Sequence, residues 1–410
     1  MHLFNPSSGL GTLVNHISEG GDSLHSQVMP IYQTSTFGFE DAEVAAATFR
    51  GEHPGYIYTR FGNPNHRQLV LSYAALEGLD LLRAHAGTAL NEIVDGQVFA
   101  SGMSAITTAI LARVKSGDTI IAQEALYGAT YTFLNEVMPR YGIKTAFIQD
   151  LTADKLDAAF TRNPGAALVF LETPTNPTLA VVDLAEAAEV AHRHQAWLMV
   201  DNTFATPYCQ RPLSLGADVV IHSTTKYLGG HGNLTGGAVI SPHLEYIRKD
   251  LLAMMKILGG TPSPFDAWQA MIGLKTFELR MARHVENAMA AARFLEGRAK
   301  VSRVYYPGLE SDPGHAIAKK QMSSFGGMLS FELKGGLPAG VSMMNHVQLA
   351  SLAPTLGNTE TLIMHPASMS HVTVPPAVRQ SMGISDGLVR LSVGIENIED
   401  ILADLEQAMA

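Results

Sequence analysis

A lysine and an aspartate, each at the end of an apolar segment, are the residues of this chain whose types and spacing best suit chemistry. The apolar segment 196–200 ends in Asp201, and Lys226 follows closely after the apolar segment 218–221. Both segments have the length and composition of buried parallel strands, so both polar side chains are expected at C-terminal strand ends. Pyridoxal phosphate (PLP) needs a lysine that forms a Schiff base with it and an acid that keeps its pyridine nitrogen protonated. The pair therefore predicts a PLP site.

Each of these residues also has a more ordinary explanation. A lysine after a strand is usually a solvated loop residue, and an aspartate at a strand end often caps a helix. Ser223-x-x-Lys226 also matches the first motif of serine acyl enzymes of the penicillin-binding type. The chain has no Ser-Asp-Asn, however, and Lys275-Thr276 is followed by Phe277 where that class needs glycine. The serine acyl interpretation is therefore disfavoured.

Composition limits the class of protein. With 410 residues, 46% hydrophobic and 16% charged, the chain can bury a large core. A net charge of -10 without a Lys/Arg-rich run argues against nucleic acid as a partner. The sequence shows neither a membrane span nor a signal peptide, so we expect no membrane partner and a cytoplasmic location. Cys209 is the single cysteine, so neither a disulfide nor a metal site is expected.

The pattern of segments predicts three parts. Residues 1–64 contain Gly, Pro and aromatic residues without sustained periodicity, which predicts an arm that contacts other subunits. Residues 65–260 alternate strands with helices, which predicts an α/β domain with ligands at C-terminal strand ends. Residues 261–410 begin with a helical stretch at 265–295 and predict a smaller α+β domain. The strands expected before residue 260 are 98–100, 119–122, 144–148, 167–171, 197–200 and 218–221.

Two loops lie where a PLP site would need them. The segment 99–105 runs from a strand through Ser-Gly into a helix, so the amides of Gly102 and Met103 would face a phosphate. The Glu-Thr-Pro-Thr-Asn-Pro loop at 172–177 could aim Asn176 at the phenolic oxygen of the cofactor. An ordinary Ser-Gly turn and a proline-fixed turn are the alternatives.

Arg390 lies on the apolar strand 388–393. A guanidinium in such a setting should have a carboxylate partner. The partner is either the carboxylate of a substrate or an acidic side chain in a structural ion pair.

Six motifs follow one another along the chain, at 56–64, 100–106, 172–177, 200–203, 222–227 and 387–394. In this order they resemble the trans-sulfuration family, the PLP-dependent enzymes of cysteine and methionine metabolism, from about Gln33 to the C-terminus. The resemblance implies PLP-dependent transferase fold type I, like aspartate aminotransferase: a large, mainly parallel α/β domain and a smaller C-terminal α+β domain. Within the family, three segments are most similar to the methionine γ-lyases: 262–268, 303–309 and 364–371.

The resemblance also implies roles for the catalytic residues. Lys226 would bind PLP and shuttle protons among the substrate carbons, and Asp201 would hold the charge on the ring nitrogen. Tyr127 would stack on the ring and assist proton transfer to the leaving group. Arg390 would clamp the substrate carboxylate, with Asn176 and Thr355 beside it.

The remaining roles concern the phosphate and the assembly. Gly102, Met103, Ser223 and Thr225 would bind the phosphate within one subunit. Tyr58 and Arg60 would reach that phosphate from the neighbouring subunit. A single subunit would then be catalytically incomplete, and the resemblance implies a homotetramer built from two catalytic dimers.

The chain departs from the methionine γ-lyases at several positions. Ala129 follows Tyr-Gly where those enzymes have cysteine, and Ile257 follows Lys256 where they usually have aspartate. Pro354 replaces the glutamate typical of cystathionine γ-lyases, which counts against cystathionine as a substrate. Residues 80–97 resemble a small insertion that is atypical of the family.

These observations favour γ-elimination from a sulfur amino acid, with methionine as the leading substrate. The alternative is γ-replacement, as in O-acetylhomoserine sulfhydrylase or cystathionine γ-synthase, because both reactions share an intermediate and differ in whether a nucleophile or water ends it. Cystathionine γ-lyase activity also stays open, whereas a PLP-free scaffold is disfavoured because it would not need Lys226, Asp201, Tyr127 and Arg390 together.

Overall fold

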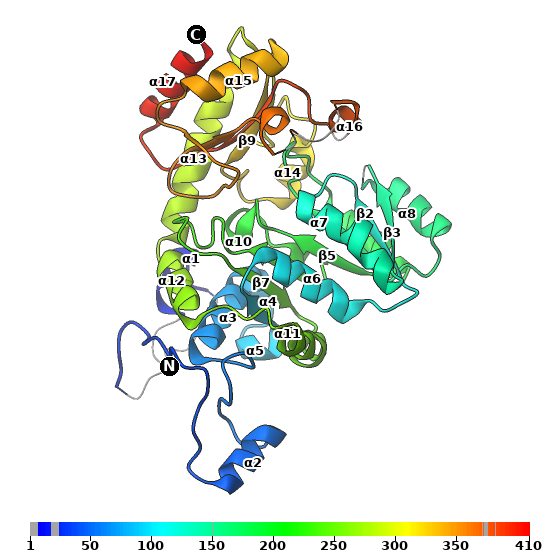
Figure 1. The fold of residues 1–410 in the computed structure, drawn as a ribbon, viewed down its shortest axis with the longest axis vertical. Helices are drawn as coiled ribbons and strands as arrows, with labels where there is room; N and C mark the ends of the chain where they lie inside the picture. Colours follow the sequence, from blue (N-terminus) through cyan, green and yellow to red (C-terminus); the bar gives the residue numbers. More distant parts are fainter. Residues whose placement is uncertain (1–6, 18–23, 150, 371, 373–375, 382) are drawn as a thin grey trace.

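Two β-sheets lie one above the other along the long axis of the molecule, each covered by helices (Figure 1). The computed structural model describes residues 7–17, 24–149, 151–370, 372, 376–381 and 383–410 of the 410-residue chain. The lower sheet has seven strands and the upper sheet has five. The predicted fold class, a mainly parallel α/β part followed by a smaller α+β part, is confirmed.

The seven-stranded sheet is parallel except for one strand, Gly237–Ser241, which the sequence analysis did not predict. Its central strands are buried on both faces: Val169 and Leu171 face one apolar cluster, and Leu168 and Phe170 face the other. A strand buried on both faces is continuously apolar, which is why the strands predicted at 167–171 and 197–200 are confirmed with shifts of one residue at their ends. The other predicted strands are confirmed too, and β1 begins three residues before the predicted segment 98–100. In sheet order the strands are β1 (Asp95–Phe99), β7 (Gly237–Ser241), β6 (Val219–Ser223), β5 (Trp197–Asp201), β4 (Leu168–Glu172), β2 (Thr119–Gln123) and β3 (Lys144–Ile148).

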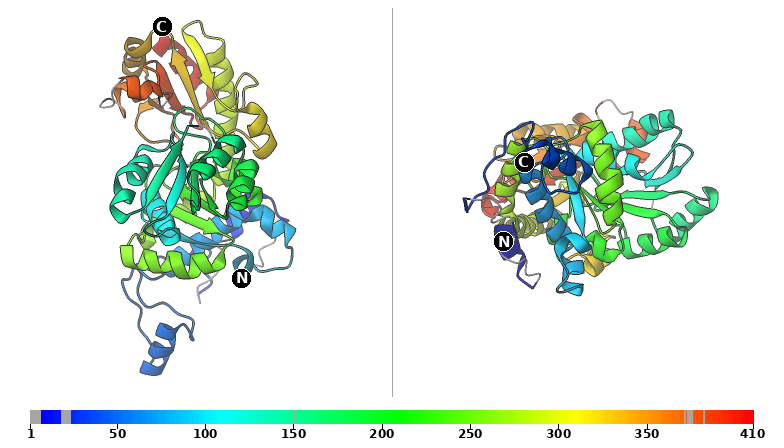
Figure 2. Two further views of the ribbon diagram at one scale, coloured as in Figure 1. Left: turned by 90° about the vertical axis from the view of Figure 1, so that its right-hand side faces the viewer. Right: turned by 90° about the horizontal axis from the view of Figure 1, so that it is seen from below.

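Helices cover both faces of this sheet (Figures 1 and 2). On one face α6 (Gly102–Arg113) packs on β6 and β7, close to α11 (Leu252–Leu258). On the other face α3 (Pro64–Glu77) packs on β1 and β7, and α9 (Leu184–Arg193) packs on β5. The smaller helices of this part are α4 (Leu79–Ala84), α5 (Leu90–Ile93), α7 (Gly128–Thr132), α8 (Ala153–Arg162) and α10 (Thr206–Cys209).

The five-stranded sheet is antiparallel except for the short pair β10 and β11. A 20-residue helix, α13 (Phe277–Glu296), packs along its strands β8 and β9. In sheet order the strands are β10 (Ser351–Leu352), β11 (Leu362–Met364), β12 (Leu388–Ser392), β9 (Met328–Leu333) and β8 (Val301–Tyr305). The other helices are α14 (His315–Gln321), α15 (Gly336–His346), α16 (Pro376–Ser381) and α17 (Ile398–Met409).

The single helical stretch predicted over 265–295 is two helices. α12 (Pro264–Leu274) ends before α13 begins, and Arg280 of α13 reaches back to the end of α12. Its Nη2 donates to the backbone O of Gly273 at 2.9 Å, and its Nη1 donates to the backbone O of Tyr227 at 2.8 Å. The hydrogen bond to Gly273 satisfies a carbonyl group at the end of α12, and the one to Tyr227 connects α13 to the turn that contains Lys226. Apolar periodicity continues across the break, so the sequence pattern did not reveal it.

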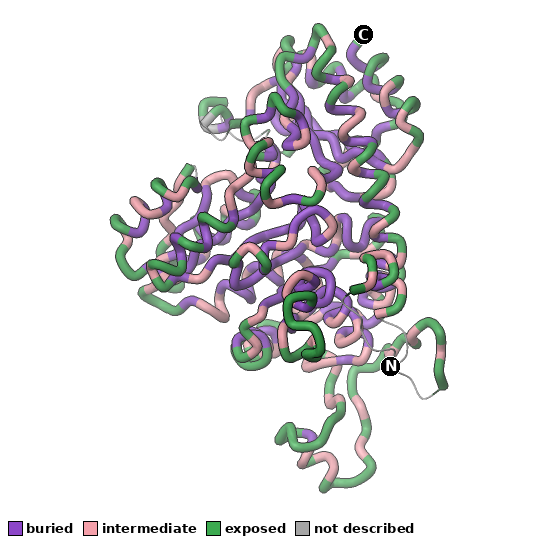
Figure 3. The backbone as a smooth tube through the Cα atoms, turned by 180° about the vertical axis from the view of Figure 1, so that it is seen from behind, coloured by how far each residue is buried: buried purple, intermediate pink, exposed green. Residues whose placement is uncertain are grey.

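The N-terminal residues form an arm that extends away from both sheets (Figures 1 and 3). The arm contains α2 (Ala42–Arg50), which the sequence analysis missed; Asp41 caps it by accepting from the backbone N of Val44 at 2.7 Å, and Gly51 ends it at a φ of 75°. α1 (Leu10–His16) packs on α13 instead. Residues 1–6 and 18–23 of the predicted arm, and residue 371 of the motif at 364–371, lie outside the described residues.

The segment 80–97, predicted as an insertion, contains α5 and the start of β1. Asp80 in α4 accepts a hydrogen bond at 2.7 Å from Nε of Arg211, which ties this segment to the body of the molecule. Among the helices of the described residues, none is long and apolar enough to cross a membrane.

Candidate active site

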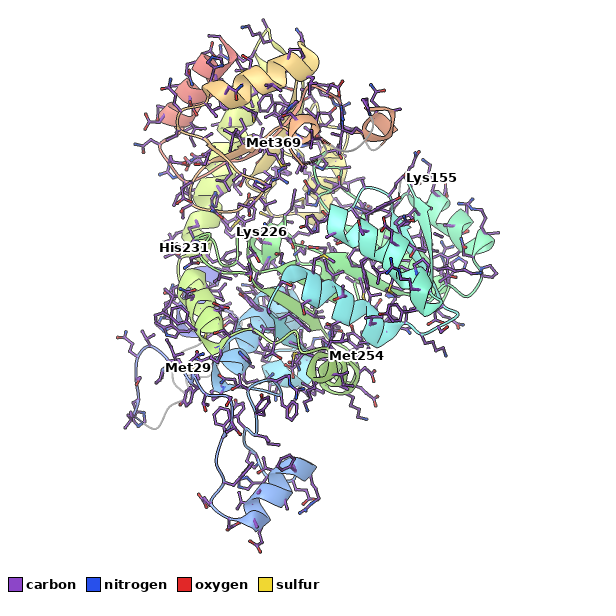
Figure 4. All side chains as sticks on the ribbon, viewed as in Figure 1. Met29, Lys155, Lys226, His231, Met254 and Met369 are labelled. Atoms are coloured by element: carbon purple, nitrogen blue, oxygen red, sulfur yellow. The ribbon has the colours of Figure 1, made fainter. Side chains whose placement is uncertain are left out.

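Polar side chains end three neighbouring strands of the large sheet. β4 ends in Glu172, β5 in Asp201 and β6 in Ser223, and these strands are adjacent in the sheet. Lys226 follows in the turn after β6, and Figure 4 shows it in the middle of the molecule, between the two sheets. In a parallel sheet this edge is where ligands bind.

A chain of hydrogen bonds joins Lys226 to the small sheet. Nζ of Lys226 donates to Oγ1 of Thr355 at 2.7 Å. The backbone O of Thr355 accepts from Nη2 of Arg390 at 3.0 Å, and Nη1 of Arg390 donates to Oδ1 of Asn176 at 3.1 Å. The structure therefore brings together four of the predicted site residues from four separate segments of the chain.

Arg390 is buried without a carboxylate. Its exposed fraction is 4%, and its hydrogen bonds go to an amide oxygen and a backbone carbonyl. Burial lowers the pKa of Arg390 to about 10, yet the group stays charged at neutral pH. Within the described residues no acidic side chain forms the structural ion pair that was the alternative for Arg390. A buried cation with only neutral partners favours an anionic ligand.

The amine of Lys226 is shifted toward its neutral form. Burial is the main cause and the positive charge of Arg390 is the second; together they lower the pKa of Lys226 to about 8. A neutral amine is the form that adds to a carbonyl group, so this shift suits a lysine that binds an aldehyde.

Asp201 is a buried carboxyl group, and only one of its two oxygens accepts the hydrogen bonds described for it. Thr203 donates to its Oδ1 from both the backbone N, at 3.0 Å, and the side-chain Oγ1. Burial raises the pKa of Asp201, and the hydrogen bonds from Thr203 oppose that rise. A cationic partner at its other oxygen would favour the ionised form, as a protonated ring nitrogen does.

A buried polar pair lies behind Asp201 on the opposite face of the sheet. Nε2 of His222, on β6, contacts Oε1 of Glu77, on α3, and both side chains are 1% exposed. Nδ2 of Asn202 donates to the same Glu77 oxygen at 2.8 Å. These contacts fix the turn after β5 and the strand that leads to Lys226.

The sequence analysis missed one buried acid at the site. Glu172 lies beside Asp201, and its Oε2 accepts from the backbone N of Tyr127 at 2.8 Å. Tyr127 itself is 48% exposed at the start of α7. The signal that identified Asp201, an acid at the end of an apolar strand, was equally present for Glu172 in the motif at 172–177.

The beginning of α6 faces the turn after β6. Ser101 caps α6, and in the described part of the chain the backbone N–H groups of Gly102 and Met103 donate no hydrogen bond. A β-carbon at Gly102 would lie 2.7 Å from Cβ of Ser223, so only glycine permits this close approach. Oγ1 of Thr225 lies in the same turn. Free amides and hydroxyls beside a lysine amine and a buried acid fit the phosphate, aldehyde and ring nitrogen of PLP.

Tyr58 and Arg60 are not part of this cluster. Both lie on the exposed arm, and the guanidinium of Arg60 stacks 4.7 Å from the ring of Phe61 and contacts the backbone O of Lys256. Arg60 also accepts a hydrogen bond at its backbone O from Thr261, at 3.1 Å. Its described contacts are therefore with the surface near α11 and α12, away from Lys226.

Comparisons with known proteins agree with this geometry. Residues 11–410 match the family model described as Cys/Met metabolism PLP-dependent enzyme. The chain is 46% identical to the L-methionine gamma-lyase of Fusobacterium nucleatum subsp. polymorphum, over 98% of both chains. It is 41% identical to the cystathionine beta-lyase of Coxiella burnetii, over 99% of both chains. The crystal structure of cystathionine gamma synthase from Xanthomonas oryzae pv. oryzae with cystathionine superposes with a TM-score of 0.88 at 37% identity, covering 98% of both chains.

Proposed function

This chain belongs to the Cys/Met metabolism PLP-dependent enzyme family, and from that premise we propose that it is a lyase that eliminates the γ-substituent of sulfur amino acids. The leading reaction is that of methionine γ-lyase, which converts L-methionine into methanethiol, ammonia and 2-oxobutanoate. The observation that supports it most directly is Arg390, a buried guanidinium with only neutral partners, joined through Thr355 to Lys226. That spacing places a cation for an α-carboxylate next to an amine that exchanges with an α-amino group.

The chemistry supplied by bound PLP is electron withdrawal from the carbon atoms of the amino acid. Lys226, partly neutral near pH 8, takes and returns protons at Cα and Cβ of the substrate. Asp201 keeps the proton on the ring nitrogen. With PLP bound, Tyr127 would stack on its ring and would donate a proton to the sulfur that leaves from Cγ.

The binding roles of the other residues follow from their positions. The amides of Gly102 and Met103, with Ser223 and Thr225, bind the phosphate at the beginning of α6. Asn176 orients Arg390 by accepting its hydrogen bond at Oδ1, at 3.1 Å, and its amide group would bind the phenolic oxygen of the cofactor. We also propose that the chain divides into an arm (1–64), a PLP-binding domain (65–260) and a C-terminal domain (261–410).

The assembly is the finer part of the proposal. We infer a homotetramer of two catalytic dimers in which Tyr58 and Arg60 reach the phosphate of a neighbouring subunit. Two observations support it: the arm extends away from its own sheets (Figure 3), and apolar side chains on it are exposed, Phe49 by 65% and Leu24 by 84%. Such apolar exposure is typical of a surface that a partner covers. The cytoplasmic location stays a prediction.

A second function has its own support. γ-Replacement is favoured by the similarity to a cystathionine gamma synthase and by Ala129, an exposed small residue directly after the Tyr127-Gly128 turn. A small residue here leaves room for an incoming nucleophile or a bulkier γ-substituent.

One comparison of products separates the two functions. The enzyme is incubated with L-methionine alone and then with O-acetylhomoserine plus methanethiol, and 2-oxobutanoate and methionine are measured. Elimination predicts 2-oxobutanoate as the main product in both incubations. Methionine as the main product of the second incubation, with little turnover in the first, would establish the transferase instead.

A further inference from the structure

Two buried carboxyl groups lie side by side at the site, and only one of them binds the cofactor ring in the proposed function. Glu172 pairs with Asp201 in the parallel register of β4 and β5, so both side chains point to the same face of the sheet. Glu172 is 5% exposed and Asp201 is 7% exposed. Within the described residues, neither forms an ion pair with a lysine or arginine. The second acid therefore needs an explanation.

Glu172 contacts the backbone of the loop that presents Tyr127. Its Oε2 accepts from the backbone N of Tyr127 at 2.8 Å. Gln123, at the end of β2, completes the support: its Nε2 donates to the backbone O of Ala125 at 2.5 Å and to the backbone O of Glu172 at 3.0 Å. The loop 125–127 is thus held by side chains from two strands, whereas the Tyr127 side chain is half exposed.

We propose that Glu172 is a positioning residue: its carboxyl group, held against Asp201, fixes the backbone amide of Tyr127 and so places the tyrosine over the cofactor ring. This role rests on the proposed function for its catalytic consequence. The hydrogen bond itself does not depend on which reaction the enzyme performs.

The surroundings of Glu172 favour its neutral form. Burial first, and then the charge of Asp201, raise the pKa of Glu172 to about 8. The groups in contact with this pair are the backbone amides of Tyr127 and Asn176 at Glu172, and Thr203 at Asp201. Among the described residues, the only charged group besides the pair itself that affects either pKa is His222, which acts on Asp201 from the opposite face of the sheet. A neutral carboxyl group still accepts the N–H of Tyr127 with one oxygen and carries a proton that it can donate. Glutamine has the same shape and also accepts and donates, so it should replace Glu172 well.

The geometry gives the expected size of the effect. Tyr127 is 48% exposed, so the position of its ring depends largely on the backbone of the loop. A misplacement of about 1 Å in a catalytic group costs roughly 100-fold in rate. The loss should fall on kcat more than on KM, because Tyr127 acts on the departing group rather than on the carboxylate held by Arg390.

The test compares three variants of the full-length holoenzyme. Glu172→Ala removes the acceptor, and Glu172→Gln keeps it without a charge. Asp312→Ala is the matched control, because Asp312 is a buried carboxyl group that accepts from the backbone N of Gly314 at 2.8 Å and of Tyr306 at 3.1 Å, outside the site. Hydrogen exchange of the peptide that contains the Tyr127 amide is followed by mass spectrometry, alongside kcat and KM.

We expect Glu172→Ala to speed exchange of the Tyr127 amide about tenfold, since a hydrogen bond contributes roughly this factor, and to lower kcat about 100-fold. Glu172→Gln should stay within about threefold of the wild type in both measurements, and Asp312→Ala should leave Tyr127 exchange unchanged.

Three results would overturn the proposal. Unchanged exchange in Glu172→Ala would show that the carboxyl group does not hold the loop. A Gln variant as impaired as the Ala variant would show that charge, not the hydrogen bond, is needed. Equal acceleration in Asp312→Ala would show a general loss of stability. Because exchange is measured without substrate, failure of the proposed γ-elimination would leave this test intact.

Discussion

The cluster around Lys226 and the arm that contains Tyr58 and Arg60 are built in opposite ways. In the cluster, Arg390 and Asp201 lie on buried strands and are hydrogen-bonded by residues of the loops around them, so their positions are fixed before any ligand binds. On the arm, Tyr58 is 38% exposed and Arg60 contacts the surface of its own chain. The difference indicates that one subunit already contains, in fixed positions, the groups proposed for proton transfer and for binding the substrate carboxylate. The groups on the arm acquire a role only if another subunit receives them.

The largest expected effect tests the cluster. Lys226→Ala should abolish turnover, by about 10⁴-fold or more, because the proton carrier is lost. PLP should still bind, since the substitution leaves the proposed phosphate site at Gly102 and Ser223 unchanged. Absorbance of the bound cofactor, before and after borohydride treatment, measures both points: borohydride should fix the cofactor covalently in the wild type and not in the variant. A wild-type protein that stays colourless with added PLP would refute the cluster as a PLP site.

The second prediction tests the arm. Arg60→Ala and Lys226→Ala should each be inactive, but a mixture that exchanges subunits should regain about a quarter of wild-type activity, since half of the dimers are hybrids with one complete site. Activity is measured after exchange has been demonstrated by mass spectrometry of tagged subunits. If no activity returns, each site is complete within its own subunit and the contrast between the two regions is wrong.

The third prediction concerns the buried guanidinium. Arg390→Lys keeps a positive charge but cannot form a bidentate pair of hydrogen bonds with the substrate carboxylate. The kcat/KM for methionine should therefore fall about 10- to 100-fold. Arg113→Lys serves as the control, because Arg113 is an arginine that stacks 4.6 Å from the ring of Trp197, remote from the proposed substrate. Steady-state kinetics with methionine and with an analogue that lacks the carboxylate should show the loss only for methionine.

A pH-dependent prediction separates the buried from the exposed cations. The pKa of Lys226 is lowered to about 8 in the folded chain, whereas a lysine in the unfolded chain has its ordinary pKa of 10.5. The folded state therefore binds fewer protons between these values, and the buried charge destabilises the cofactor-free protein most below pH 8. Lys226→Met should raise the free energy of unfolding by on the order of 1 to 3 kcal/mol at pH 7, with the gain disappearing as pH rises through 8 to 10.5. Denaturant unfolding at a series of pH values measures it, and Arg60→Met, on the exposed arm, should change stability little at any pH.

The smallest expected effect concerns specificity. Ala129 lies exposed in α7, next to the Tyr127 turn, and is smaller than the cysteine of the methionine γ-lyases that the chain resembles. Ala129→Cys should shift the ratio of kcat/KM for methionine over ethionine toward methionine, by no more than roughly 1 to 3 kcal/mol. Kinetics with both substrates measure the ratio. An unchanged ratio would direct attention to Ile257, which is 76% exposed, and to Pro354.

Much of the fold was determined by local sequence. Segments such as 168–171 and 197–200 are apolar throughout because their strands are buried on both faces, so their positions could be predicted without a structure. Asp201 and Lys226 could be identified for the same reason, since each follows such a segment. β7 was missed because Gly237 and the glycines before it resemble a turn, and α2 was missed because alanines give little periodicity.

Only the tertiary structure decided which of these residues meet. Thr355 and Arg390 come from segments far from Lys226 in the sequence, and the packing of the small sheet on the large one joins them through hydrogen bonds of 2.7 and 3.0 Å. The same packing leaves Arg390 without an acidic partner, which composition cannot reveal. Glu172 had the sequence signal of Asp201, but its contact with the Tyr127 amide depends on how the ends of β2 and β4 pair. Residue types and apolar segments are local properties, whereas burial, pKa and the distance between two side chains depend on contacts made across the whole chain.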